Sequence, residues 1–90
     1  MPLLHIEPEE LRITARRLTQ MADEIDWQVQ RMENARQILQ TTWKGNGRLQ
    51  FQEEMDHRLH TLHRLSYEIS GMSLRLQREA NKWEEVSCWF

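Results

Sequence analysis

The apolar residues in the first half of the chain repeat every seven positions. The repeating set is Leu11, Leu18, Ile25, Met32 and Leu39, and the residues between them are Ala15, Ala22, Val29, Arg36 and Trp43. This alternating spacing keeps one stripe of a helix facing a partner helix. The pattern therefore predicts a helix over residues 8–42. Its start is marked by Pro8, which is tolerated at a first helical position, and by Glu9 and Glu10, which favour the positive end of the helix dipole.

The second half of the chain repeats the same seven-residue pattern. The apolar set is Met55, Leu62, Ile69, Leu76 and Trp83, and the residues between them are Leu59, Ser66, Ser73 and Ala80. We expect a second helix over residues 48–84, followed by a short tail over residues 85–90. Leu65 and Met72 widen the apolar stripe on one side of this helix.

A turn separates the two predicted helices at the middle of the chain. Two of the three glycines lie there, in Trp43-Lys44-Gly45-Asn46-Gly47. Gly and Asn reach left-handed backbone conformations at low cost, so residues 43–47 are expected to form the turn. The fold class is therefore all-α, one domain over residues 1–90, built as a helix–turn–helix hairpin.

A single hairpin of this length buries little apolar surface. Chains this small usually need disulfides or a partner for stability. Cys88 is the only cysteine, so a disulfide within the chain is excluded. We therefore expect a dimer, in which the seven-residue rows form the core. Its central residues are Leu18, Ile25, Met32, Leu62, Ile69 and Leu76.

Composition narrows the possible functions. The net charge of -2 gives no reason to expect nucleic acid, whose binding depends on Lys and Arg. No apolar run approaches the roughly 20 residues of a membrane span. The first residues have neither the basic region nor the apolar stretch of a signal peptide. We expect a soluble protein that does not leave the cell by the signal-peptide route.

Candidate chemistry is sparse. His57, His60 and His63 step by three, and Glu54 with His57 has the Glu-x-x-His form of di-iron bundles. Such sites need two copies of the motif, pointing inward, whereas the seven-residue pattern places His57 and His60 on the solvent side. Cys88 has no catalytic histidine context. We therefore expect no enzyme activity, no metal and no cofactor.

The length, the two long helices and the central Trp43-Lys44-Gly45 resemble the WXG superfamily of ESAT-like proteins. The opening Ile6-Glu7-Pro8-Glu9-Glu10-Leu11-Arg12 is also similar to the start of that family. These proteins are small substrates and partners of type VII (ESX) secretion systems. The resemblance implies an antiparallel four-helix bundle of two hairpins, made with a second copy or with a related WXG-like chain. It also implies export without a signal peptide, after synthesis in the cytoplasm, and an ESX-type ATPase as a further partner.

The resemblance also implies which residues act. Trp43 and Gly45 match the signature turn. The recognition surface is expected near the end of the second helix and in the tail, at Trp83, Glu84, Glu85, Trp89 and Phe90. One feature departs from the family: many members carry an aromatic residue followed four positions later by Asp or Glu. Here Trp83 is followed at that distance by Ser87. Either a partner supplies the export signal, or this lineage has a relaxed one.

A second class of function remains open. A regulatory or nucleic-acid-binding hairpin dimer that is not secreted would use Arg12, Arg16 and Arg17 as its basic patch. Acidic residues outnumber basic ones, however, and the aromatic residues are not interleaved with the arginines.

Overall fold

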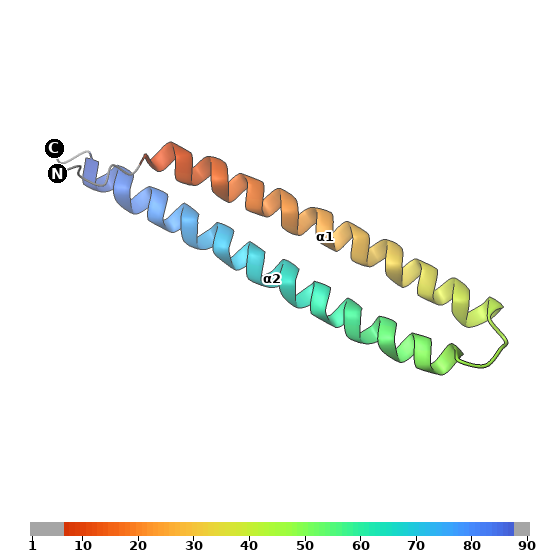
Figure 1. Cartoon of the computed structure of the whole chain (residues 1–90). Coiled ribbons are helices and arrows are strands. Elements are labelled where there is room, and N and C mark those ends of the chain that lie inside the picture. The colour runs from red at the N-terminus through yellow and green to blue at the C-terminus, as the bar shows by residue number, and fades with distance from the viewer. Residues whose placement is uncertain (1–6, 88–90) are drawn as a thin grey trace.

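Two long antiparallel helices make up the part of the chain described by this computed structural model, residues 7–87 (Figure 1). Helix α1 spans Pro8–Thr42 and helix α2 spans Arg48–Ser87. The molecule is 69 Å long and 22 × 16 Å across, with a radius of gyration of 20.3 Å. A compact domain of this length would have a radius of gyration of roughly 12 Å. The predicted all-α helical hairpin is confirmed, and its rod shape leaves much of each helix outside any core.

The beginning of α1 follows from its first residues. Glu7 has an extended backbone, with φ −89° and ψ 112°, and Pro8 follows at the first helical position. The Glu7 carbonyl accepts hydrogen bonds from the N–H groups of Glu10 at 3.0 Å and Leu11 at 3.3 Å. The missing N–H of Pro8 therefore costs no hydrogen bond.

The turn between the helices depends on Trp43 and Gly47. Trp43 leaves the helix with φ −85° and ψ 113°, while its N–H still donates to the Leu39 carbonyl at 2.8 Å. Gly47 has φ +87°, the left-handed region that side chains other than glycine rarely adopt. Its carbonyl accepts the N–H of Phe51 at 2.9 Å, which closes the first turn of α2.

The end of α2 corrects the expected boundary at residue 84. The helix continues through Glu85 and Val86 to Ser87, so the first half of the expected tail is helical. No glycine or proline lies between Gly71 and Cys88 that could end the helix earlier. The expectations for Cys88, Trp89 and Phe90 lie outside the described residues. Neither helix in the described part of the chain has a stretch long and apolar enough to cross a membrane.

Small side chains fill the contact between the helices. On α1 the buried residues are Ala15, Ala22 and Val29, seven positions apart. On α2 the buried residues are Gln52, Leu59, Ser66, Ile69, Ser73 and Ala80. Because alanine and serine are short, the two backbones approach closely over the half of the hairpin nearer its open end. We call these two rows the small-residue seam.

Two serines tie this seam together. Ser73 Oγ donates to the Ala15 carbonyl at 2.7 Å and lies 2.7 Å from Thr19 Oγ1, whose proton can complete the chain of hydrogen bonds. Ser66 Oγ lies 3.2 Å from the Ala22 carbonyl and also contacts an Asp26 carboxylate oxygen, and its single proton serves one of them at a time. Buried hydroxyls need such partners, so each serine fixes the position of one helix along the other.

The larger apolar rows lie beside the seam rather than in it. Within the hairpin, Ile69 is buried, whereas Leu18, Ile25, Met32, Leu62 and Leu76 are half-buried. Contact between two helices covers only one stripe of each, and the small residues already occupy that stripe. The large residues therefore remain available, and their burial in a dimer core stays a prediction.

Replacing Ser73 by leucine should lower the free energy of unfolding by about 1–3 kcal/mol, because the longer side chain overfills the closest part of the seam. Ser73→Ala should cost about 1 kcal/mol, the usual net contribution of one hydrogen bond. Urea unfolding followed by circular dichroism, at fixed protein concentration, measures both changes. Ser70→Leu, at an exposed position three residues away, is the control. Equal losses for the two leucine variants would contradict the role of the seam.

Candidate interaction surface

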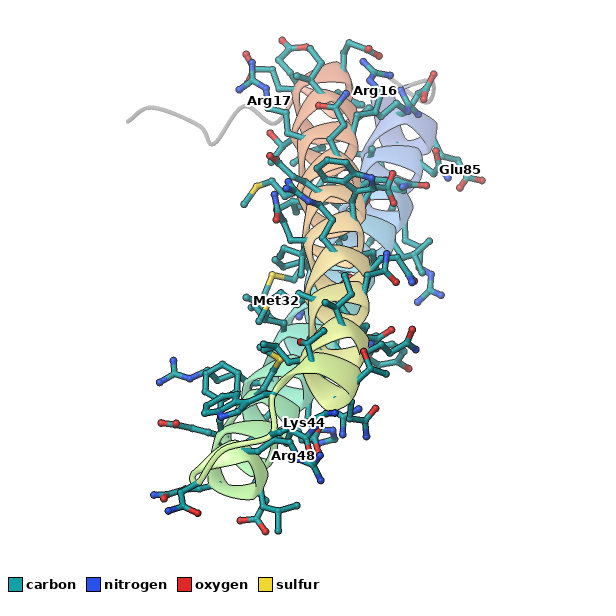
Figure 2. The ribbon with its side chains drawn as sticks, turned by 90° about the vertical axis from the view of Figure 1, so that its right-hand side faces the viewer. Arg16, Arg17, Met32, Lys44, Arg48 and Glu85 are labelled. Carbon is teal, nitrogen blue, oxygen red and sulfur yellow. The ribbon has the colours of Figure 1, made fainter. Side chains whose placement is uncertain are left out.

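One broad face of the hairpin is apolar and uncovered. Met32 and Leu62 line one shallow hollow between the helices, and Met21, Ile25 and Leu62 line the next. The rows of large residues on α1 and α2 therefore lie on the same side of the rod. Figure 2 shows the yellow sulfur atoms of methionines on the side to which Met32 points. We call this surface the apolar face. It consists of Leu18, Met21, Ile25, Met32, Met55, Leu62, Leu65, Ile69, Met72, Leu76 and Trp83.

Several of these side chains are strongly exposed in the single chain. Met72 is 55% exposed, Met21 50% and Leu65 42%. Glu54, His57 and Arg58 border the hollow at Met32 and Leu62. Large exposed apolar patches rimmed by polar residues usually mark a binding site. The six predicted core residues all belong to this face. The structure thus brings them together on one surface, although a single hairpin leaves five of them incompletely covered.

On the opposite side of the rod, charged side chains of the two helices pair with each other. Arg36 lies across from Asp56, with Nε 2.7 Å from Oδ1 and Nη2 donating to Oδ2 at 3.1 Å. The Nε contact is an ion pair, and the directed hydrogen bond comes from Nη2. His63 Nε2 lies 3.5 Å from Glu33 Oε1. These partners link α1 to α2 within one chain.

Arg36 interrupts the apolar row of α1, and its head group is paired within the chain. Arg36 is held by Asp56, which comes from the other helix, and the Arg36 side chain is only 28% exposed. The sequence pattern could identify Arg36 as a break in an apolar row, but not its partner. That pairing depends on how far one helix is shifted along the other.

Trp43 packs at the corner of the hairpin. Its ring centroid lies 5.4 Å from that of Phe51, and the ring planes are inclined by 52°. A Cβ at Gly45 would lie 3.2 Å from Trp43 Nε1, closer than ordinary van der Waals contact. Residues 43–50 surround an open hollow at this end of the rod. The two signature positions are thus coupled: Gly45 leaves room for the indole of Trp43.

The residues proposed for the end of α2 point in different directions. Trp83 continues the apolar row and is 37% exposed. Glu84 forms an ion pair with Arg12, and the same guanidinium donates to Asn81 Oδ1 at 3.1 Å. Figure 2 shows Glu85 on the outer side of α2. Trp83 therefore belongs with the apolar face, whereas Glu84 joins the open ends of the two helices.

The histidines do not form a metal site within residues 7–87. No group of three or more His, Cys, Asp or Glu side chains is placed there to hold an ion. His63 contacts Glu33, and His57 and His60 are exposed.

Comparisons with known proteins agree with this geometry. Residues 3–86 match the WXG100 family, described as proteins of 100 residues with WXG. Among solved structures, the chain is similar to the secreted protein EsxB of Bacillus anthracis str. Sterne. The TM-score is 0.84 at 26% identity, over 97% of this chain and 99% of that one. A glycine-to-alanine variant of EsxB gives a TM-score of 0.82 at 27% identity, covering 93% and 97% of the two chains. No curated protein matches the sequence.

Changing Gly45 to alanine should displace the indole of Trp43, because the new Cβ meets Nε1. The expected result is a shifted indole N–H resonance of Trp43 in a 1H–15N spectrum, with the far-ultraviolet spectrum unchanged. Gly47→Ala should instead lower the free energy of unfolding by about 1–2 kcal/mol, the cost of a left-handed backbone for a residue with a Cβ. An unchanged indole resonance in the Gly45 variant would contradict the coupling.

The signature tripeptide lies at the corner of a two-helix hairpin, and the family match covers nearly the whole chain. This protein therefore belongs to the WXG100 family.

Proposed function

We propose that this chain is a secreted substrate or partner protein of a type VII (ESX) secretion system and that it acts as a dimer of hairpins. The observation that carries the proposal is the apolar face, which runs along both helices of a WXG100 chain and which one hairpin cannot cover. A second hairpin placed on this face completes a four-helix bundle. The printed description of EsxB as secreted supports the export part of the proposal.

Dimerisation follows from the amphipathic character of the rod. Ion pairs on the opposite side of the rod join α1 to α2 within one chain, whereas Met21, Leu65 and Met72 of the apolar face remain exposed in a single hairpin. Burying apolar surface contributes about 25 cal/mol per Å². Stacking two apolar faces therefore gives the core that one hairpin lacks, built on the rows of Leu18, Ile25 and Met32 with Leu62, Ile69 and Leu76. The partner is a second copy or a related WXG-like chain.

Export would use both ends of the rod. We propose the Trp43 and Gly45 corner as one recognition element and the end of α2, including Trp83, as the other, with an ESX-type ATPase as the receptor. In an antiparallel bundle, the end of α2 of one subunit lies near the corner of the other. The absence of an acidic residue four positions after Trp83 means that any such contact depends on the aromatic residues.

The nucleic-acid alternative is weakened by the placement of the arginines. Arg12 pairs with Glu84, and Arg16 Nη2 lies 3.4 Å from Glu9 Oε1. Figure 2 shows Arg16 and Arg17 on different sides of α1. The three arginines thus do not present one basic surface, and phosphate binding would require such a surface.

Ile25→Asp should convert the dimer into a folded monomer, because it places a charge in the middle of the proposed interface. Light scattering should then give a mass near the 11.0 kDa of one chain, against twice that value for the wild type. Ile13→Asp is the matched control, since Ile13 lies on the outer side of α1 and is 38% exposed. Equal loss of dimer in both variants would count against the apolar face as the interface.

Trp43→Ala should leave both helices formed and strongly reduce export. The two measurements are a far-ultraviolet melt and secretion from a host that carries the cognate system. Trp27→Ala is the control for loss of a tryptophan, because Trp27 is 60% exposed away from the corner. Normal secretion of folded Trp43→Ala would remove the corner from the proposed signal. A collapsed melt would instead identify Trp43 as a structural residue.

A further inference from the structure

We propose that Met21 and Met72 are sites of reversible oxidation to methionine sulfoxide, and that this modification prevents a partner from binding the apolar face while the hairpin stays folded. The co-reactant is a two-electron oxidant of the peroxide class. This inference rests on the proposed role of the apolar face in association. The observation that carries it is the unequal distribution of sulfur between the apolar face and the small-residue seam.

The methionines of the two helices all belong to the apolar face. They are Met21 and Met32 of α1 and Met55 and Met72 of α2. Met21 and Met32 border neighbouring hollows that share Leu62. Figure 2 shows sulfur atoms on the side to which Met32 points. The leucine and isoleucine side chains around them carry no group that a peroxide oxidises, so the thioethers are the reactive groups of this surface.

The small-residue seam, by contrast, contains no sulfur. Its members are alanine, serine, valine, leucine, isoleucine and glutamine side chains. The hydrogen bonds of Ser66 and Ser73 that fix one helix along the other have oxygen atoms as donors and acceptors. An oxidant of thioethers therefore leaves the contacts that hold α1 against α2 chemically unchanged.

Exposure selects two of the four methionines. Met72 is 55% exposed and Met21 50% in the single hairpin, whereas Met32 and Met55 are half-buried. A dissolved oxidant must reach the sulfur, so Met21 and Met72 react first. A partner lying on the apolar face would cover both side chains. The unpaired chain is thus the reactive form, and association protects it.

The reaction at each methionine is the transfer of one oxygen atom. A lone pair of the thioether sulfur attacks one oxygen of the peroxide, the O–O bond breaks and an S–O bond forms. With hydrogen peroxide the products are methionine sulfoxide and one water molecule, which carries both peroxide protons. The sulfur loses two electrons and the peroxide gains them. Methionine sulfoxide reductases reverse the change, one class for each sulfoxide epimer.

The new oxygen acts on binding rather than on folding. A sulfoxide is polar and accepts hydrogen bonds, whereas the thioether that it replaces is apolar. Around Met21, the side chains of Ile25 and Leu62 offer no donor. A partner's apolar side chains would leave the sulfoxide oxygen buried without a hydrogen bond, which opposes association. In the open hairpin, water hydrates the same oxygen, so the fold is unaffected.

Limited peroxide treatment tests the proposal, in a Cys88→Ser background that removes the thiol. Peptide mass mapping should find oxygen at Met21 and Met72 before Met32 and Met55. Sedimentation equilibrium should then show the dimer Kd raised about a hundredfold or more, because each chain would bury two unpaired sulfoxides. The far-ultraviolet spectrum should stay helical, and methionine sulfoxide reductases of both epimer classes should restore the original Kd.

Two leucine variants are the matched controls, since leucine has a similar volume and no sulfur. Met21→Leu combined with Met72→Leu should keep its Kd after the same treatment. Met32→Leu combined with Met55→Leu should stay as sensitive as the parent chain. Equal sensitivity of the two double variants would overturn the assignment of the sites. Loss of the helical spectrum on limited oxidation would overturn the separation of binding from folding.

A further measurement separates this inference from the proposed dimer. A chain that is monomeric before any peroxide is added would contradict pairing of two copies. The same treated and untreated chains are then compared by the fluorescence of an anilinonaphthalene sulfonate dye, which binds exposed apolar surface. Oxidation of Met21 and Met72 should lower dye binding. Unchanged dye binding would overturn the inference, whichever partner the apolar face takes.

Discussion

The close contact between two rows of small residues is the constraint on which the rest of this hairpin depends. Ala15 and Ala22 face Ser66 and Ser73, and the serine hydroxyls reach backbone carbonyls of the other helix. Short side chains bring the helices together, and the hydroxyls fix their shift. Once this stripe is occupied, the large apolar residues must lie beside it. A hairpin that fills its own seam in this way leaves most of its larger apolar residues half-buried or exposed beside it.

Much of this architecture could be read from the spacing of residues. The seven-residue rows, Pro8 and the glycines of the turn gave both helices and the corner, since each reflects a local backbone preference. The same rows did not reveal which apolar residues one hairpin buries. Ala15 and Leu18 are three residues apart and belong to neighbouring rows on the same helix. Packing against the other helix decides which of the two rows is buried. The serines at positions 66 and 73, spaced by seven opposite Ala15 and Ala22, were the available signal.

Ion pairs between residues far apart in the sequence could not be predicted from the residue pattern, for a different reason. Arg36 with Asp56 and Arg12 with Glu84 depend on the shift between the helices, and a shift of one turn would give each arginine another neighbour. At the corner, position 45 favours glycine because a Cβ there would meet the Trp43 indole, and not because of its backbone angle. Among residues 7–87, Gly47 alone has a positive φ. The signature glycine thus has a steric role that only the side-chain geometry reveals.

The start of α1 and the end of α2 lie at the same end of the 69 Å rod, opposite the corner (Figure 1). This arrangement has a practical consequence. A tag, fluorophore or fused domain attached beyond either α1 or α2 begins at the end farthest from the tryptophan corner. An insertion between Lys44 and Asn46 would instead separate the indole from its glycine. For labelling or for fusion to a reporter, an attachment before α1 keeps clear of the corner and adds nothing to the end of α2, which we propose for recognition.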